Sequence, residues 1–367
     1  MLEQILSLPI EKKVGQLFFI GLSGAELEKS SRELLNIISP GGVCLFSRNI
    51  REAKQTRKLL DDVRNELSIE PFLSIDQEGG LVDRLRRIVE PMPAADMFRK
   101  SQDIEKFAEL TAGIIRLLGF NMNFAPVVDV IDDVRKVSNN GLYSRAFGNS
   151  KEETTEFVSI YLETLQKNGC LGCLKHFPGL GASKNDSHEE LPLVDIDEKE
   201  LFEVDLLPYQ KLFKTSEVNA VMIAHASFPK SNLQETDQNG KLLPSSLSFN
   251  FVTKLLRQKL GFQKLAITDD LEMGAILKNY EIGEACKMAV AAGEDILALC
   301  CNPQLIEDGY NEVLKAVKSG EISEDRIDDS LKRIADVKSK IKSPSEFDES
   351  RLQELSSDIK ALKHNLS

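Results

Sequence analysis

Long apolar runs are missing from this 367-residue sequence. A membrane-spanning helix needs about 20 consecutive apolar residues, and no segment of the chain supplies them. Near the N-terminus, Glu3 and Glu11 interrupt a short apolar stretch that no basic segment precedes, a pattern that differs from a secretion signal. We therefore expect a cytoplasmic protein with no membrane partner.

Positive charge is also in short supply. The chain has 46 Lys and Arg against 58 Asp and Glu, which gives a net charge of -12. A long-range field of this sign repels polyanions. The composition therefore argues against a nucleic-acid partner, whereas a few local Arg or Lys side chains suffice to hold an anionic small molecule.

The cysteines do not form a metal-binding pattern. Cys170 and Cys173 have the spacing of half a zinc site, but no second pair with ligand spacing follows. Cys44, Cys300 and Cys301 lie in apolar runs, where a free thiol behaves as a small hydrophobic side chain. We therefore expect neither a metal site nor a cofactor.

Eight short segments have the length and the β-branched or aromatic content of buried parallel strands; they begin at residues 14, 41, 71, 122, 173, 220, 265 and 295. Helical patterns lie between them, and we predict helices over 51–67, 247–260 and 323–341. Ser323 is the expected N-cap of the last of these helices, and Gly261 the expected end of the second.

This alternation of strands and helices, with right-handed crossovers, predicts an α/β fold. We predict a single (β/α)8 barrel of the TIM type over residues 1–341, followed by a charged helical tail over 342–367. A doubly wound sheet is the alternative. The barrel is favoured because the strand number matches and because no Gly-rich dinucleotide fingerprint follows the first strand.

Polar side chains interrupt several of these apolar strands at matching ends, namely Asp76, Asp129, Lys175, His176, His225, Asp269 and Asp270. In such barrels the chemistry takes place at the carboxyl ends of the strands, so we expect these groups to meet at one mouth. Charges buried there without a function would be costly. Taken alone, His225 is more typical of a core histidine than of a catalytic one, and Asp270 is more typical of a helix N-cap or of an acceptor that supports the site.

The segment CLKHFPGLGASKNDSHEELP, residues 173–192, holds two of the four histidines of the chain. These residues alone leave two interpretations open. The segment is either a solvated loop, or a mobile loop that carries proton-transfer groups. In the second interpretation, Gly179 and Gly181 allow movement, and Asp186 orients His188.

Six motifs resemble, in order, those of the family 3 glycoside hydrolases: DQEGGLVDR (76–84), NFAPVVDV (123–130), SRAFG (144–148), KHFPGLGASKNDSH (175–188), VMIAHASFP (221–229) and LAITDDLEMGA (265–275). The Asp-x-His loop makes the series similar, more narrowly, to the single-domain β-N-acetylhexosaminidase branch of this family. The resemblance implies an enzyme that removes N-acetylglucosamine from cell-wall fragments such as muropeptides, or from chitooligosaccharides.

The resemblance also implies a role for each matching residue. Asp269 corresponds to the nucleophile, His188 to the general acid/base, and Asp186 to the carboxylate that orients the imidazole. The residues that correspond to those gripping the sugar are Asp76, Arg84, Arg145, Lys175 and His176. One departure is Leu180, which stands where the family commonly has a histidine between two glycines.

These residue types suit a retaining glycosidase, which needs an ionised carboxylate and a group that first gives and later takes a proton. A histidine, with an intrinsic pKa of about 6.5, starts close to the working pH. A phosphorylase of the same fold stays open, because a neutral imidazole repels phosphate less than a carboxylate does. An inactive barrel that only binds sugars is a further alternative. The expected protein is a monomer.

Overall fold

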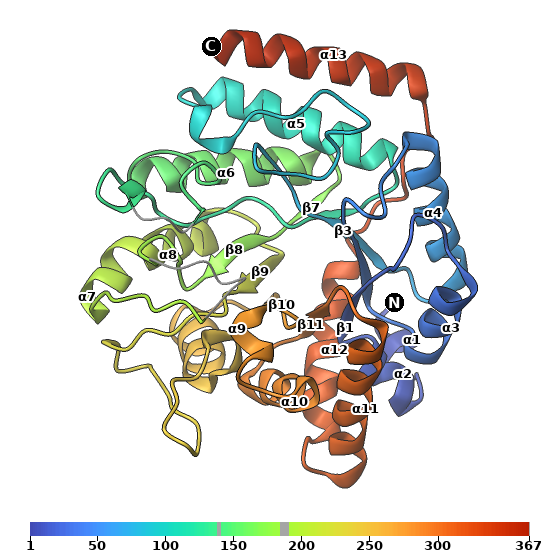
Figure 1. Ribbon diagram of the computed structural model, residues 1–367, viewed down its shortest axis with the longest axis vertical. Helices are drawn as coiled ribbons and strands as arrows, with labels where there is room; N and C mark the ends of the chain where they lie inside the picture. The colour runs from blue at the N-terminus through green and yellow to red at the C-terminus, as the bar shows by residue number, and fades with distance from the viewer. Residues whose placement is uncertain (138–140, 184–190, 367) are drawn as a thin grey trace.

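The structure is a computed structural model and describes residues 1–137, 141–183 and 191–366. Its main sheet contains nine parallel strands in the order β7-β6-β3-β2-β1-β11-β10-β9-β8. They are β1 (Phe18–Gly21), β2 (Gly42–Leu45), β3 (Phe72–Ile75), β6 (Met122–Asn123), β7 (Leu171–Gly172), β8 (Leu174–Phe177), β9 (Ala220–Ile223), β10 (Leu265–Asp270) and β11 (Ile296–Leu299). Figure 1 shows the strands at the centre with helices around them.

The two strands at the ends of this order are adjacent in the sequence, and only β8 lies within the strand predicted from residue 173. β7 pairs with β6, and β8, which begins two residues after the end of β7, pairs with β9. The stretch 171–177 therefore connects both ends of the sheet, and the strands form a nearly closed barrel. The predicted barrel is confirmed, and the doubly wound alternative is wrong.

The larger helices cover the outside of the barrel: α3 (Lys29–Ile38), α4 (Ala53–Glu66), α5 (Ser101–Leu117), α6 (Lys151–Lys167), α8 (Leu206–Thr215), η5 (Asn250–Lys259), α10 (Ile282–Ala292), α11 (Pro303–Ser319) and α12 (Glu324–Lys338). Three of them match the predicted helical segments, although η5 has π-helical bonding. Ser323 caps α12 as predicted, because its side chain accepts a hydrogen bond from the backbone N–H of Arg326 at 3.2 Å.

Shorter elements fill the connections: α1 (Leu2–Leu6), α2 (Ile10–Gly15), η1 (Ala95–Met97), η2 (Arg135–Val137), α7 (Glu198–Glu200), η3 (Leu201–Asp205), η4 (Ser245–Leu247) and α9 (Gly274–Leu277). A two-stranded antiparallel hairpin, β4 (Gln77–Gly79) and β5 (Val82–Asp83), follows β3 directly. This hairpin begins one residue after Asp76 and therefore extends from the carboxyl end of β3.

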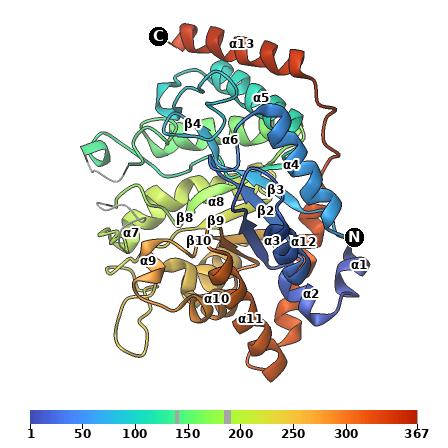
Figure 2. The same cartoon turned by 45° about the vertical axis from the view of Figure 1, so that its right-hand side comes forward.

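The chain ends in α13 (Glu349–Leu366), which lies along the outer face of α5 (Figures 1 and 2). Its buried residues are Leu352, Leu355, Ile359 and Leu362. Burial of such side chains contributes about 1.5–3 kcal/mol each relative to full exposure, so the helix is held mainly by this apolar stripe. The division of the chain into a barrel over 1–341 and a tail over 342–367 stays a prediction. Among the described helices, none has the length and apolar character needed to cross a membrane.

Candidate active site

A cavity of about 540 Å³ lies at the carboxyl ends of the barrel strands. Its lining includes the predicted residues Asp76, Arg84, Arg145, Lys175, His176 and Asp269. These side chains come from four distant parts of the sequence, and the barrel brings them together. The expectation that polar strand ends share one mouth is therefore confirmed for Asp76, Lys175, His176, Asp269 and Asp270, whereas Asp129 and His225 are absent from the described lining.

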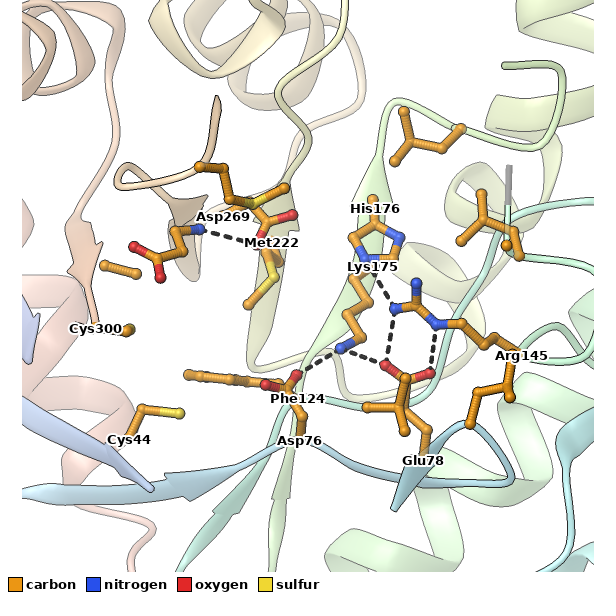
Figure 3. A pocket seen from close by; sticks show the side chains of 18 of the residues that line it. Cys44, Asp76, Glu78, Phe124, Arg145, Lys175, His176, Met222, Asp269 and Cys300 are labelled. Atoms are coloured by element: carbon orange, nitrogen blue, oxygen red, sulfur yellow. Dashed lines mark hydrogen bonds and ion pairs between the residues drawn. The ribbon is translucent and has the colours of Figure 1, made fainter. Parts of the chain in front are cut away.

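One wall of the cavity is a network of ion pairs (Figure 3). The Nζ atom of Lys175 lies 2.7 Å from Oδ1 of Asp76 and 2.6 Å from Oε1 of Glu78. Arg145 donates from Nε and Nη2 to the two carboxylate oxygens of Glu78, over 2.8 and 2.9 Å. Because Lys175 and Glu78 are almost completely buried, each needs its partners to offset the loss of hydration.

All three central members of this network are ionised. Burial raises the pKa of Glu78, but Arg145 and Lys175 outweigh burial and hold this pKa well below its usual range. Burial lowers the pKa of Lys175, and Asp76 and Glu78 raise it by more. Burial also lowers the pKa of Arg145, and Glu78 more than offsets this. The wall therefore presents fixed charges at neutral pH.

His176 is oriented by Asp129, which lies behind it. The distance between His176 Nδ1 and Asp129 Oδ2 is 2.8 Å, and because a carboxylate only accepts, Nδ1 carries the proton. The second oxygen of Asp129 accepts the backbone N–H of Leu180 at 2.6 Å. Nε2 of His176 lies 3.5 Å from Nη2 of Arg145, which can only donate. This arrangement assigns one tautomer and one ring orientation to His176.

Asp269 lies on the opposite side of the cavity from the ion-pair wall (Figure 3). Its Oδ1 atom accepts the backbone N–H of Asp270 at 2.9 Å. Burial raises the pKa of Asp269, but His176, His225, the backbone N–H of Asp270 and the Lys175 ammonium together lower it by more, so that this pKa lies below its ordinary value. Asp269 is thus an ionised carboxylate that faces the cavity, the state required of a nucleophile.

Asp270 differs from its neighbour in charge and contacts. Its Oδ1 atom accepts the backbone N–H of Glu272 at 3.0 Å, so the side chain stabilises the turn that follows β10. Burial raises the pKa of Asp270 to about 7. The N-cap interpretation of Asp270 is wrong, because the N-cap of α9 is Met273 and the Asp270 side chain instead accepts a hydrogen bond within the turn before that helix.

His225 is fully buried and is absent from the described lining of the cavity. Its Nε2 atom lies 3.0 Å from the carbonyl oxygen of Asp270, which only accepts, so Nε2 carries the proton. Nδ1 accepts from the hydroxyl of Ser246 at 2.7 Å. Burial lowers the pKa of His225 and keeps the ring neutral. The core interpretation of His225 therefore fits its surroundings, and its contact with Asp270 supports the end of β10.

Arg84 is held less tightly than the other cations of the cavity. Its Nη2 atom lies 3.8 Å from Oδ2 of Asp76, and its buried Nε atom has no hydrogen-bond partner among the described residues. The guanidinium lies over the ring of Phe46, with the central carbon 5.6 Å from the ring centroid, and Arg48 lies 4.9 Å from the same centroid. Cation–π contact with Phe46 thus keeps Arg84 beside the cavity while its donors stay available.

The start of the predicted catalytic loop is tightly packed. A Cβ atom on Gly179, whose φ is +139°, would lie 2.6 Å from Cβ of Asp205. A Cβ atom on Gly181 would lie 2.2 Å from the carbonyl oxygen of Val130. Gly179 therefore allows close packing against the Asp205 side chain, and Gly181 allows close approach to the Val130 backbone, whereas the sequence suggested that both glycines allow movement. The side chain of Leu180 lines the cavity as an apolar wall in place of the family's usual histidine.

Two predicted residues, Asp186 and His188, lie outside the described residues, which end at 183 and resume at 191. Glu78 was not predicted as a site residue, and the contact of Asp129 with His176 was not predicted, although the structure connects both residues to the site. Glu78 belongs to the DQEGG motif but received no role, although a carboxylate two residues after Asp76 was a visible signal. Asp129 was placed at the mouth only by its strand end, and nothing in the sequence indicated its contact with His176.

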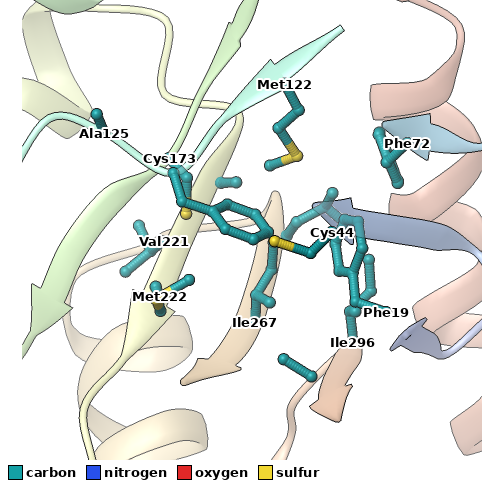
Figure 4. Close-up of a cluster of buried hydrophobic side chains, with 14 of the residues drawn as sticks. Phe19, Cys44, Phe72, Met122, Ala125, Cys173, Val221, Met222, Ile267 and Ile296 are labelled. Atoms are coloured by element: carbon teal, nitrogen blue, oxygen red, sulfur yellow. The ribbon is translucent and has the colours of Figure 1, made fainter. Parts of the chain in front are cut away.

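The floor of the cavity is apolar and continues into the barrel core. Phe124 and Met222 line the cavity, and Figure 4 shows Met222 within a cluster of buried hydrophobic side chains. Phe19 packs edge-on against Phe124 at a centroid distance of 5.4 Å, and against Phe72 at 5.7 Å. The polar wall is therefore mounted on a close-packed interior that limits its movement.

A barrel with its polar groups at the carboxyl ends of the strands, and with an ionised carboxylate opposite a charged binding wall, has the architecture of a glycoside hydrolase. The profile described as "Glycosyl hydrolase family 3 N terminal domain" matches residues 9–337, almost the entire chain. The chain therefore belongs to glycosyl hydrolase family 3.

Curated relatives carry the same family relationship. The chain is 30% identical over 289 residues to the β-hexosaminidase of Psychromonas ingrahamii, covering 77% of this chain and 81% of the relative. It is 28% identical over 364 residues to that of Pasteurella multocida, covering 94% and 99%. In β-hexosaminidase A of Pseudoalteromonas piscicida, which is 28% identical, the matched region spans about half of the relative, 55%.

Solved structures agree with this assignment. A family 3 β-N-acetylglucosaminidase from Paenibacillus sp. superimposes with a TM-score of 0.87 and 31% identity, covering 97% of this chain and 69% of that one. A family 3 glycosyl hydrolase from Mycobacterium smegmatis has a TM-score of 0.80 and 29% identity, covering 91% and 98%. The second structure shows that a chain of nearly the same extent forms this fold.

Proposed function

We propose that this protein is a retaining exo-β-N-acetylglucosaminidase that removes terminal N-acetyl-β-D-glucosamine from peptidoglycan fragments. The observation that carries the proposal is the ionised Asp269 carboxylate, which faces the ion-pair wall across the cavity. The β-hexosaminidases of Psychromonas ingrahamii and Pasteurella multocida support the reaction type. A cavity of about 540 Å³ lies within the range of small-molecule sites.

In the proposed first step, Asp269 attacks the anomeric carbon and the leaving oxygen receives a proton, giving a glycosyl–Asp269 intermediate. In the second step, water attacks the same carbon and the proton-transfer group takes a proton from it. The motif assigns this group to His188, with Asp186 as its orienting carboxylate. Asp269 is fixed for attack by the N–H of Asp270 and by the support of His225 beneath the end of β10.

The binding part of the proposal uses the opposite wall. Asp76 accepts from sugar hydroxyl groups, and Lys175, Arg145 and Arg84 donate to sugar oxygens. His176, with its proton on Nδ1, keeps Nε2 toward Arg145 and the cavity. Because these charges are paired before a sugar arrives, little side-chain entropy is lost on binding.

Water is a better acceptor than phosphate in this cavity. Among the described lining residues, the carboxylates Asp76, Glu78 and Asp269 equal in number the cations Arg84, Arg145 and Lys175, and Asp270, whose pKa burial raises to about 7, adds a partial negative charge. A phosphate dianion would therefore meet no net positive charge there. This balance favours hydrolysis over the phosphorylase alternative, and the retained ionised Asp269 argues against an inactive barrel. Action on cytoplasmic muropeptides by a monomer stays a prediction.

The proposal is tested by replacing the nucleophile. Asp269→Ala should reduce hydrolysis of p-nitrophenyl N-acetyl-β-D-glucosaminide by at least about 10³-fold, because no covalent intermediate can form. The matched control is Asp270→Ala at the neighbouring position, which should keep far more activity. Turnover of Asp269→Ala close to that of the unmodified protein would refute the assignment. The product should be free N-acetylglucosamine even in millimolar phosphate.

A further inference from the structure

The carboxylate of Glu78 contacts two cations of the binding wall at once (Figure 3). It lies on β4 and is only 5% exposed. Oε1 is shared between Nζ of Lys175, at 2.6 Å, and Nη2 of Arg145, at 2.9 Å, and Oε2 accepts from Nε of Arg145 at 2.8 Å. Both carboxylate oxygens of Glu78 thus accept hydrogen bonds from Lys175 or Arg145.

This geometry fixes the donors before any substrate is present. The paired bonds from Arg145 to Glu78 define the plane of the guanidinium, because a fork–fork pair allows one relative orientation. Lys175, which has a long flexible side chain, is held between Asp76 and Glu78. Displacement of such donors by about 1 Å is enough to reduce catalysis about 10²-fold. Glu78 therefore governs binding geometry through Lys175 and Arg145, the side chains proposed to donate to the sugar.

Glu78 also sets the charge of the cavity. Two buried cations without a counterion would attract any small anion, since charges interact strongly where water is excluded. Asp76 interacts with Lys175 and Arg84, whereas the side-chain ion pair of Arg145 is with Glu78. Without the charge of Glu78, Arg145 would lose this partner and Lys175 would keep only one.

We propose that Glu78 is a positioning and specificity-determining residue, which holds Lys175 and Arg145 in place and makes the cavity reject small anions in favour of uncharged sugars. This proposal rests on the proposed function where it concerns turnover, but its anion-rejecting part does not. The chemical class discriminated against includes inorganic phosphate, sulfate and sugars that carry an acidic group at the bound end.

The test compares Glu78→Gln and Glu78→Asp. Gln keeps the shape of the side chain but has no charge and one acceptor oxygen, so kcat/KM for the nitrophenyl substrate should fall about 10²-fold. We expect phosphate and sulfate to inhibit the unmodified enzyme weakly, and to inhibit Glu78→Gln competitively at concentrations at least about tenfold lower. Glu78→Asp keeps the charge on a shorter arm, so it should lose turnover while anion inhibition stays weak.

A second readout needs no activity. Sulfate should raise the melting temperature of Glu78→Gln more than that of the unmodified protein, because a ligand that binds only the folded state stabilises it. The control is Glu294→Gln, at a glutamate outside the cavity that is equally buried and whose pKa burial raises well above its usual range. Its response to sulfate should equal that of the unmodified protein.

An unchanged response of folded Glu78→Gln to sulfate and phosphate would overturn the anion-rejecting role. If Glu78→Gln does not fold, Glu78→Asp provides the test, because it should lose turnover while its inhibition by anions stays weak. Strong anion inhibition of Glu78→Asp together with the loss of turnover would overturn the proposal. Absence of hydrolysis by the unmodified protein would instead refute the proposed function, and the melting comparison would still test Glu78.

Discussion

Asp129 and His176 are joined by a hydrogen bond of 2.8 Å, and the same carboxylate accepts the N–H of Leu180 at 2.6 Å. One buried side chain therefore connects the His176 ring, which lines the cavity, to the first residues of the loop that carries the Asp-x-His motif. Asp129 is not in the cavity lining, so its effect on substrate is exerted through His176.

Asp129→Asn should reduce kcat/KM about 10²-fold. The amide has one acceptor oxygen, and its NH2 group would face either the N–H of Leu180 or the Nδ1 proton of His176. A steady-state assay on the nitrophenyl substrate measures the loss, and Asp133→Asn, at an exposed position of the same connection, is the control. Full activity in Asp129→Asn would contradict a role of the Asp129–His176 hydrogen bond in catalysis.

Gly181, at the start of the predicted loop, gives a prediction about the stability of the protein. Gly181→Ala should lower the free energy of unfolding by about 1–3 kcal/mol, because the new Cβ would overlap the carbonyl oxygen of Val130. Gly24→Ala is a suitable control, since its new Cβ would meet only the flexible Glu28 carboxylate, 3.3 Å away. Urea denaturation of both variants compares them, and equal stability would contradict the packing role.

His225 predicts a pH dependence of stability. Burial lowers the pKa of His225 in the folded protein, so below about pH 6.5 the unfolded chain binds a proton that the folded chain does not. The contribution of His225 is therefore complete above about pH 6.5 and is lost as the pH falls toward the lowered value.

His225→Gln cannot titrate, so its unfolding free energy should fall less steeply between about pH 7 and pH 5 than that of the unmodified protein. It should also be less stable at about pH 8, because the bonds to Ser246 and Asp270 are disturbed. His364→Gln, at an exposed position on α13, should leave the slope unchanged. Identical slopes for His225→Gln and the unmodified protein would contradict the assignment of a neutral ring.

Much of the fold could be predicted because parallel barrel strands are short apolar runs with a polar residue at one end. That pattern placed Asp76, Lys175, His176 and Asp269 at one mouth. It could not show that the stretch 171–177 forms two strands, because the change of partner from β6 to β9 depends on the neighbours and not on the local residues.

The contacts between side chains could not be predicted from the sequence for a similar reason. Glu78 and Arg145 are 67 residues apart, and Asp129 and His176 are 47 apart, so only the closed barrel makes them neighbours. Alternation along a strand could not choose between Asp269 and Asp270 either. Their different environments, with one pKa lowered and the other raised to about 7, separate the two carboxyl groups.

The most direct measurement is to trap the intermediate with a 5-fluoro-N-acetylglucosaminyl fluoride and map the labelled peptide by mass spectrometry. The account predicts one label, on Asp269, with no label in Asp269→Ala and labelling preserved in Asp270→Asn. Covalent modification at any other residue, or inactivation with no covalent label while the unmodified enzyme turns over hexosaminides, would contradict it.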